Sequence, residues 1–267
     1  VMDNLATFVR LVTQLSSEDN NARQEAERAL EDAKKQVPDQ LVIALALILQ
    51  NDTIELQHRS LAAILLRRQV NLLPSVNDNT TETLKANIVQ ALQQTTDRTI
   101  LRHLCHLTSA FAGHILSEGG NWPEILNFLV HWTQSENEIH RAAALEIFSE
   151  LLSHLDTDFD SFFDTLKGIL IKGLQDPCIK VRLAALSGTV HFLVYRSKSR
   201  SEFQPFLPHM FEIVSLSVAQ GDDETARAAL ECLIELVEFS PSFFLEHLKD
   251  LLENMFKVAT DTSVEDS

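Results

Sequence analysis

The side chains with the best spacing for metal chemistry lie in one short stretch, where His103, Cys105 and His106 are followed by His114. Positions i and i+3 share a face of a helix, so His103 and His106 could hold one ion. A structural zinc site needs four ligands, and no carboxylate or further His/Cys pair completes the set. We therefore interpret this stretch as a partly buried helix with polar edges, and we predict no metal site and no cofactor.

No part of the sequence has the spacing of a catalytic motif. Gly-rich phosphate loops, the GxSxG turn of serine hydrolases and the HExxH helix of zinc proteases are all missing. The cysteines Cys105, Cys178 and Cys232 lie far apart, which argues against a disulfide framework and for a reducing compartment. We predict that the protein is not an enzyme, with an unrecognised site in the groove of the folded chain as the alternative.

The composition indicates a helical protein that binds other proteins. Only 7 of the 267 residues are glycine, where roughly 7% is usual, so sheets and tight turns are disfavoured. The 22 basic and 38 acidic residues give a formal net charge of −16, which excludes a duplex-nucleic-acid binder of the usual basic kind. The longest apolar run, residues 41–49, is too short to cross a bilayer. We predict no direct contact with nucleic acid or membrane.

Helical periodicity, with breaks at Pro, Gly, Asp and Asn, divides the chain into paired segments. The expected pairs are 4–15 with 20–36, 38–51 with 54–73, 81–94 with 98–116, 122–133 with 138–154, 159–175 with 177–195 and 203–219 with 224–238. The segment 241–259 stands without a partner, and residues 260–267 have the composition of a turn. We therefore expect a fragment of a longer array.

The second helices share an arginine followed by small residues, as in Arg141-Ala-Ala-Ala-Leu145. Such arginines recur at intervals of 36 to 45 residues, at Arg23, Arg59, Arg102, Arg141, Arg182 and Arg227. This is close to the period of about 40 to 47 residues of two-helix solenoid repeats. Each of these arginines is preceded by an acidic or amide residue, and that side chain could cap the second helix and meet an arginine of a neighbouring repeat. These residues are Asp19, Asp52, Asp97, Asn137, Asp176 and Asp222. These features predict an all-α, right-handed superhelical solenoid of HEAT repeats, with about six and a half antiparallel helix pairs, rather than a compact bundle.

Two sequence features suggest binding surfaces. Residues 200–267 hold 14 acidic and 4 basic residues, a balance that would attract a basic partner, although solvated faces are often acidic too. The first helices of the fifth and sixth repeats are rich in phenylalanine, and neighbouring helices of this kind could leave apolar grooves for aromatic side chains of a disordered partner. Core packing is the alternative explanation for these phenylalanines.

The sequence resembles the N-terminal part of the karyopherin-β (importin-β) nuclear transport receptors, most closely the importin-β3 branch, with importin-4-like receptors as the alternative branch. The resemblance runs from residue 5 to the end of the chain. Its motifs are Leu15-Ser-Ser-Glu-Asp-Asn-Asn-Ala-Arg-Gln-Glu-Ala-Glu27, Leu61-Ala-Ala-Ile-Leu-Leu-Arg-Arg68, Gly120-Asn-Trp-Pro-Glu124 and Arg141-Ala-Ala-Ala-Leu-Glu-Ile-Phe148.

This resemblance implies a binding site for Ran-GTP on the inner, concave helices of the first four repeats, residues 1–154. Carried over by position, the Ran contacts fall on Glu27, Glu31, Gln57, Arg67, Arg68, Glu146 and Glu150. Only the Leu-Leu-Arg-Arg stretch matches a family motif closely, and an alternative reading of Arg67 and Arg68 is a cation pair that complements the dipole at a helix end.

The resemblance also implies contacts with Phe-Gly nucleoporins on the convex side of residues 155–267. The expected residues are Phe162, Phe163, Leu166, Phe203, Phe206 and Met210. A receptor of this kind would be a monomer that carries basic protein cargo between cytoplasm and nucleus through nuclear pores, with its main cargo site beyond this fragment. The alternative function is a HEAT-repeat scaffold subunit of a multi-protein assembly, such as a phosphatase.

Overall fold

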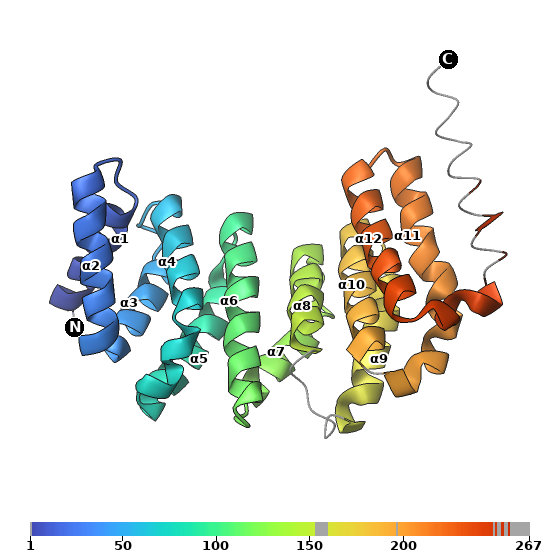
Figure 1. Ribbon diagram of the computed structural model, residues 1–267, viewed down its shortest axis with the longest axis horizontal. Helices are drawn as coiled ribbons and strands as arrows, with labels where there is room; N and C mark the ends of the chain where they lie inside the picture. The colour runs from blue at the N-terminus through green and yellow to red at the C-terminus, as the bar shows by residue number, and fades with distance from the viewer. Residues whose placement is uncertain are drawn as a thin grey trace, which may run out of the picture. The chain divides into compact units, whose positions relative to one another are not determined.

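The structure, a computed structural model, describes residues 2–152, 160–195 and 197–247, together with residues 249, 252, 253 and 256. All the regular secondary structure in these residues is helical (Figure 1). The α-helices are α1 (Met2–Leu15), α2 (Asn20–Gln36), α3 (Pro38–Gln50), α4 (Leu56–Arg68), α5 (Asp78–Gln94), α6 (Arg98–Ser117), α7 (Pro123–Trp132), α8 (Glu138–Leu151), α9 (Asp160–Leu174), α10 (Ile179–Tyr195), α11 (Leu207–Ala219) and α12 (Asp223–Phe239). Short 3₁₀ helices follow α4, precede α11 and follow α12, as η1 (Val70–Ser75), η4 (Ser197–Phe206) and η5 (Pro241–His247).

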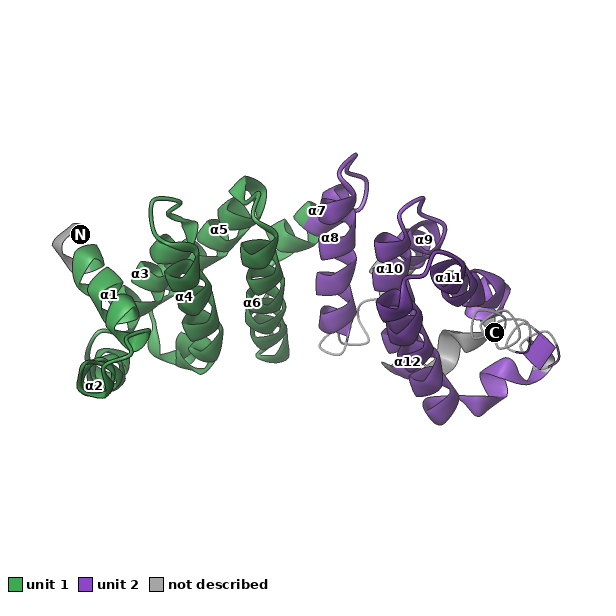
Figure 2. Cartoon of the chain, turned by 90° about the horizontal axis from the view of Figure 1, so that it is seen from above, with its two compact units in different colours: residues 1–128 green, residues 129–267 purple. Residues whose placement is uncertain are grey.

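The helices form pairs that stack within two compact units, residues 1–128 and 129–267 (Figure 2). In the first unit α1 packs on α2, α3 on α4 and α5 on α6, while α3 also contacts α1 and α5, and α4 contacts α6. In the second unit α9 packs on α10 and α11 on α12, while α10 lies between α8 and α12. First helices thus stack on first helices in the first unit, and second helices contact second helices in both units, which confirms the predicted all-α array of helix pairs. The predicted functional boundary between residues 154 and 155 lies outside the described residues and stays a prediction.

The predicted helix caps form at most of the turns within pairs. The carboxylate of Asp19 accepts a hydrogen bond from the backbone N–H of Asn21 at 2.9 Å, and that of Asp97 accepts one from Ile100 at 2.9 Å. Asn137 and Asp222 cap α8 and α12 in the same way. These bonds satisfy N–H groups that have no partner inside the helix.

The prediction for Asp52 was wrong. Helix α4 begins only at Leu56, and its N-cap residue, Glu55, makes no side-chain cap bond. The turn is instead closed by Asn51, whose side-chain oxygen accepts bonds from the backbone N–H of Thr53 at 3.0 Å and from its hydroxyl at 2.7 Å. Asp52 therefore lies three residues before the N-cap position, too far from the first turn of α4 to cap it.

Helix α4 also ends earlier than periodicity predicts, and α11 begins later. The chain turns from α4 into η1 after Arg68, and Pro74 lies inside that 3₁₀ turn. Helix α11 begins at Leu207 with Pro208 in its first turn, and η4 precedes it. A proline is favoured in the first turn of a helix but cannot continue one, which explains both shifts.

The junction between α6 and α7 is held by two glycines and a buried tryptophan. Gly119 has φ of 75°, its N–H bonds to the carbonyl of Leu116 at 3.1 Å, and the N–H of Gly120 bonds to that of Ile115 at 2.9 Å. These are the two bonds of a Schellman motif, which needs a left-handed residue after the helix. Trp122 follows at 1% exposure, and its ring centre lies 5.6 Å from that of Phe111 in an edge-to-face arrangement.

Small residues allow close approach of helices in the second unit, as the sequence predicts. A Cβ added at Gly173 of α9 would lie 2.7 Å from the Cβ of Ala185 in α10 and 3.1 Å from Leu145 in α8. A Cβ at Gly188 of α10 would lie 2.9 Å from Leu170. These glycines set how closely α8, α9 and α10 pack, because any larger side chain would force them apart.

One bidentate ion pair links the fourth and fifth repeats. Arg141 of α8 donates from Nε and Nη2 to the two carboxylate oxygens of Asp176, at 2.7 and 2.9 Å. Its Nη1 donates to the carbonyls of Ser135 and Glu136 at 2.8 and 3.0 Å. Burial by itself would raise the pKa of Asp176, but the hydrogen bonds from Arg141 and the Cys178 N–H, with the charges of Arg141 and Arg182, lower it. The predicted contact between a turn aspartate and an arginine of the neighbouring repeat therefore forms between the fourth and fifth repeats.

Candidate partner-binding surfaces

The second helices of the first unit present the residues that the family resemblance assigns to Ran. Glu27 and Glu31 lie exposed on α2, and Gln57, Arg67 and Arg68 lie exposed on α4. Arg67 and Arg68 form the last turn of α4, where cations are favoured by the helix dipole. Among the described residues, no hydrogen bond or ion pair joins the α2 glutamates to the α4 arginines. The structure thus exposes all five residues without bringing the two helices' charges together.

Two of these residues have partners on their own helices. Glu31 accepts a hydrogen bond from Lys34 at 2.6 Å, and this bond and the charge of Lys34 lower the pKa of Glu31. Gln57 donates to the carboxylate of Glu55 at 2.8 Å. These exposed bonds hold the side chains weakly, so a partner protein could replace them at little cost.

The remaining two Ran assignments lie in the second unit. Glu146 and Glu150 are exposed on α8, one turn apart on the same face of the helix. Arg141, five residues before Glu146 on the same helix, forms its ion pair with Asp176. Both glutamates are therefore accessible to a partner, and their role in binding stays a prediction.

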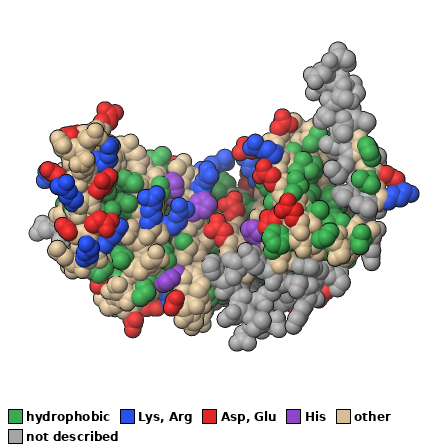
Figure 3. Space-filling model, in the orientation of Figure 1, with side chains coloured by type: hydrophobic (Ala, Val, Ile, Leu, Met, Phe, Trp, Pro, Cys, Tyr) green, Lys and Arg blue, Asp and Glu red, His purple; other side chains and the backbone are tan. Residues whose placement is uncertain are grey.

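Helices α4 and α6, which lie side by side, carry a cluster of cationic and imidazole side chains (Figure 3). Arg67 of α4 and Arg102 of α6 are exposed, and His103 and His106 of α6 are half-buried. We call these four residues the α4–α6 basic patch. Sequence reasoning weighed the two histidines as metal ligands or as polar edges of a helix, and it considered Arg102 only as one of the repeating arginines.

The metal hypothesis gains no support from the geometry of α6. Cys105, which lies between the two histidines, is only 3% exposed and belongs to the core, whereas His103 and His106 are half-buried at the surface. Within the described part of the chain, no three His, Cys, Asp or Glu side chains lie close enough together to hold a metal ion. The histidines therefore act as part of a charged surface.

A polar cavity of about 370 Å³ opens between the second and third repeats. Arg59 and Asp97 both line it, and no ion pair joins them among the described residues. Arg59 instead donates from Nε to the carbonyl of Leu49 at 3.0 Å, and Asp97 caps α6. Arg59 and Asp97 thus hold the places of the arginine and aspartate that pair between the fourth and fifth repeats, but they make separate hydrogen bonds between the second and third repeats.

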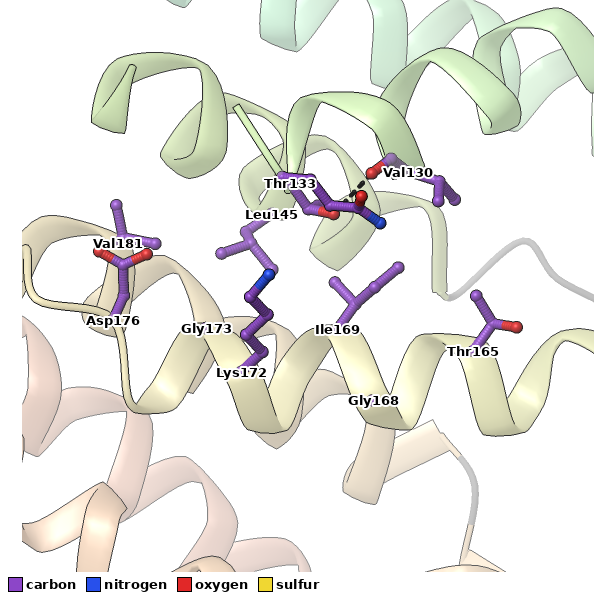
Figure 4. Close-up of a pocket in the computed structure, with 11 residues that line it drawn as sticks. Val130, Thr133, Leu145, Thr165, Gly168, Ile169, Lys172, Gly173, Asp176 and Val181 are labelled. Carbon is purple, nitrogen blue, oxygen red and sulfur yellow. Dashed lines mark hydrogen bonds between the residues drawn. The ribbon is translucent and has the colours of Figure 1, made fainter. Parts of the chain in front are cut away.

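A second cavity, of about 230 Å³, lies between the first helices α7 and α9 of the second unit (Figure 4). Val130 and Thr133 line one side, and Ile169 and Lys172 of α9 lie across from them, with Gly168 on the α9 side. Thr133 donates its hydroxyl proton to the carbonyl of Val130 at 2.7 Å, so this wall of the cavity is held in place. The further lining residues are Gln134, Leu145, Thr165, Gly173, Asp176 and Val181.

The structure places three of the six predicted nucleoporin residues in the core. Leu166 is 1% exposed, and Phe203 and Met210 are fully buried, so their side chains face no partner. Phe206 is half-buried, with its ring centre 5.7 Å from that of Phe203. The side chains of Phe162 and Phe163 lie outside the described residues. Core packing, the alternative weighed above, therefore accounts for three of the six residues, and sequence reasoning did not predict the cavity between α7 and α9.

Two family models cover most of the chain. The model described as "Importin-beta N-terminal domain" matches residues 26–94, and the one described as "IPO5-like, TPR repeats" matches residues 96–254. The described helices include none that is both long and apolar enough to cross a membrane.

Curated relatives align over nearly the whole chain. A protein named probable importin-5 homolog, from Dictyostelium discoideum, is 24% identical over 98% of this chain and 25% of its own length. Importin subunit beta-3 from Saccharomyces cerevisiae is 24% identical over 92% of this chain and 24% of its own length. The chain thus spans about a quarter of the length of these relatives.

Solved structures share the fold. Kap121p bound to RanGTP matches 98% of this chain with a TM-score of 0.82 and 20% identity, and Kap121p bound to Nup53p matches 95% with a TM-score of 0.78 and 20% identity. In each case the match covers about a quarter of the solved chain. Since the family models together account for residues 26–94 and 96–254, the chain belongs to the importin-β family of transport receptors, a non-enzymatic family, and within it to the importin-5-like (importin-β3) branch.

Proposed function

We propose that this chain is the region of a nuclear import receptor that binds Ran-GTP through the second helices of its first four repeats and Phe-Gly nucleoporins through its first helices. The observation that carries the proposal is the match of residues 26–94 to the importin-β N-terminal domain, because this range contains every Ran residue assigned to α2 and α4. The similar structure of Kap121p bound to RanGTP supports it. Within this surface, Arg67 and Arg68 supply the cations.

The charge of the α4 arginines is expected to dominate the affinity for Ran. Arg67→Glu with Arg68→Glu should weaken binding to GTP-loaded Ran at least about tenfold, or about 1.4 kcal/mol, because two attractive charges become repulsive in the same interface. The measurement is a titration of Ran carrying a non-hydrolysable GTP analogue. Helicity should not change, since both side chains are exposed.

A matched control carries the same change of net charge elsewhere. Lys180→Glu with Arg227→Glu alters two exposed cations of the second unit, on α10 and α12, outside the first four repeats. This variant should bind Ran as the parent chain does. Equal weakening by both double variants would mean that net charge alone controls the affinity, and would remove Arg67 and Arg68 from the proposed site.

The cavity between α7 and α9 is the surface that best fits a nucleoporin phenylalanine. It opens beside exposed Gly168 and Thr165 and has apolar side chains of Val130 and Ile169 at its walls. Leu145, 1% exposed, lies at its floor. The structure of Kap121p bound to Nup53p supports a nucleoporin contact in this part of the family. Among the described side chains of the predicted set, Phe206 is half-buried and the others are buried, so it remains a second proposed contact.

Filling this cavity from Gly168 should weaken the binding of a Phe-Gly peptide. Gly168 lines the cavity, and a Cβ added there meets nothing within 4 Å, so a side chain can begin at this position and Gly168→Leu tests whether bulk there blocks the cavity. The loss of a mid-helix glycine should itself stabilise α9, by up to about 1 kcal/mol. Affinity for a fluorescent Phe-Gly repeat peptide should fall about tenfold, which corresponds to the loss of one buried anchor.

Gly168→Ala is the control for this variant, since it makes the same change of helix propensity but leaves the cavity open. Its peptide affinity should equal that of the parent chain. If Gly168→Leu binds the Phe-Gly peptide as tightly as Gly168→Ala does, the peptide occupies another groove and this assignment fails.

The wider role follows from the family. We propose that the full-length receptor is a monomer that carries basic protein cargo and shuttles between cytoplasm and nucleus, with its main cargo site beyond this region. The acidic excess of residues 200–267, with 14 acidic against 4 basic residues, supports a basic cargo. The alternative, a scaffold subunit in a multi-protein assembly, would share the fold but bind Ran in neither nucleotide state.

A further inference from the structure

Arg59, at the contact between the second and third repeats, has no partner among the described residues for the two Nη groups of its guanidinium. Its Nε donates to the carbonyl of Leu49 at 3.0 Å. Together with the turn that precedes α6, Arg59 lines the polar cavity of about 370 Å³. The corresponding arginine of the fourth repeat, Arg141, instead holds both carboxylate oxygens of Asp176. Arg59 is therefore an arginine beside a cavity whose strongest donors are unused.

The turns before the second helices share a register that can be counted back from their arginines. In three repeats the carbonyl of the residue six positions earlier accepts a hydrogen bond from the arginine, and these pairs are Ser17 with Arg23, Ser135 with Arg141 and Asp176 with Arg182. In the third repeat the residue six positions before Arg102 is Thr96. Asp97, the aspartate of that turn, lies one position later and caps α6. By register, Thr96 therefore corresponds to Asp176.

A hydroxyl stands at this register position in each of the first four repeats. Ser17 and Ser135 each accept a hydrogen bond from the backbone N–H two residues further on, both at 3.2 Å. Thr53 donates its hydroxyl proton to the side chain of Asn51 at 2.7 Å. Thr96 is exposed, and its hydroxyl makes no hydrogen bond with a described residue. Of these four hydroxyls, that of Thr96 is thus both exposed and unengaged.

We propose that Thr96 is a phosphorylation site, and that its phosphate pairs with Arg59 as Asp176 pairs with Arg141. A protein kinase transfers the γ-phosphoryl group of ATP to Oγ1 of Thr96: the new P–O bond forms, the bond to the leaving ADP breaks, and the hydroxyl proton passes to the kinase. The phosphate brings about −1.5 to −2 charges at pH 7 and three acceptor oxygens, which suit bidentate binding by a guanidinium. The modification thereby links the turn before α6 to α4.

The side chain of Thr95 supplies a further donor. Its hydroxyl oxygen is buried without a hydrogen-bond partner among the described residues, and Thr95 lines the same cavity as Arg59. A buried hydroxyl without a partner is costly, so a ligand that accepts its proton is favoured. An anion attached at Thr96 would meet both this hydroxyl and the guanidinium.

The other charges at the cavity favour an attached phosphate over a free anion. Asp52 and Asp97 also line the cavity, and each repels an anion that enters from solution. A phosphate on Thr96 is held near Arg59 by the chain itself, and such tethering gives an effective concentration in the millimolar range that offsets this repulsion. The site therefore responds to a modifying enzyme and not to phosphate in solution.

Hydrogen exchange measures whether the phosphate closes this contact. The probe is the whole chain carrying phosphothreonine at position 96, compared with the same chain after a phosphatase has removed the phosphate. Amides of residues 95–101 should exchange at least about fivefold more slowly in the phosphorylated chain, because a charge-assisted bond holds this turn to α4. Amides of residues 220–226, in the turn between α11 and α12, are the internal reference and should not change.

Two arginine variants identify the partner of the phosphate. In Arg59→Gln the difference between the phosphorylated and dephosphorylated chains should disappear. In Arg98→Gln, the matched control, the difference should persist, because Arg98 is exposed two residues from Thr96 but is not among the residues that line the cavity. Circular dichroism of each variant checks that the helices are retained.

Incubation of the chain with ATP and a eukaryotic cell extract tests the modification itself. Mass spectrometry should find phosphate on Thr96. Phosphate found only on other residues, exchange rates unchanged by phosphate at Thr96, or slowing that survives Arg59→Gln would each overturn the proposal. Equal slowing of the unmodified chain by about 10 mM inorganic phosphate would show a site for free anions instead. None of these measurements uses Ran or a nucleoporin, so the result is independent of the proposed function.

Discussion

Replacement of Trp122 by alanine is expected to lower the free energy of unfolding by about 3–5 kcal/mol, the usual cost of removing a large aromatic side chain from a core. The indole is 1% exposed and meets Phe111 edge to face at 5.6 Å. The surrounding turn has little freedom to collapse into the space, because Gly120 is bonded to Ile115 and Lys85 donates to the carbonyl of Asn121 at 3.0 Å. Urea unfolding followed by circular dichroism measures the loss.

Two further variants separate packing from general effects of losing an aromatic ring. Trp122→Phe should retain part of the edge contact with Phe111 and therefore lose clearly less stability than Trp122→Ala. Phe239→Ala removes a side chain that is 60% exposed and should change stability by no more than about 0.5 kcal/mol. If Trp122→Ala were no more destabilising than Phe239→Ala, the tryptophan would not anchor the junction between α6 and α7.

Removal of Arg141 should have the second large effect, about 3 kcal/mol, since it leaves the carboxylate of Asp176 without its counterion. The side chains of Arg141 and Asp176 are only 15% and 10% exposed. The variant Arg141→Ala also loses the bonds to the carbonyls of Ser135 and Glu136. The measurement is again the free energy of unfolding in urea at pH 7.

Arg59→Ala is the matched control, because Arg59 holds the equivalent place in the second repeat without an ion pair to Asp97. It makes one bond, to the carbonyl of Leu49, so the variant should lose about 1 kcal/mol. Equal losses for Arg59→Ala and Arg141→Ala would contradict a special role for the Arg141–Asp176 pair.

The cost of Arg141→Ala should also depend on pH. The pKa of Asp176 is lowered in the folded chain, so the pair contributes its full stability above the unfolded value of about 3.9 and loses it as the pH falls through the folded value. The gap between the parent chain and Arg141→Ala should therefore narrow below about pH 4. A gap that stays constant down to pH 2 would show that the carboxylate is not the partner that matters.

The sequence predicts the helices and their caps well because both depend on nearby residues. Asp97 caps α6 through a bond to a residue three positions on, and Gly119 ends α6 through bonds within five positions. The prediction for Asp52 was wrong because the turn before α4 is longer than the pattern suggests, and Asn51 takes over its closure. Local signals therefore predict the helix pairs, and helix boundaries and caps are predicted wrongly where a turn is longer than the pattern suggests.

The binding surfaces depend on contacts between distant residues, which periodicity does not reveal. Apolar spacing indicates that Phe203 and Met210 face a neighbouring helix, but it does not tell a groove that is open from one that is filled, and both side chains are buried. The α4–α6 basic patch joins Arg67 to His103 across an intervening helix. Neither α4 nor α6 contains an acidic residue, but α10 contains none either, so this sequence signal does not single out the pair.

The central claim, that this chain is a Ran-binding region of an import receptor, is tested most directly by titrating it with Ran in its two nucleotide states. Ran loaded with a non-hydrolysable GTP analogue should bind at least about tenfold more tightly than Ran loaded with GDP. Equal affinity for the two states, or binding to neither, would contradict the claim and favour a scaffold with the same fold.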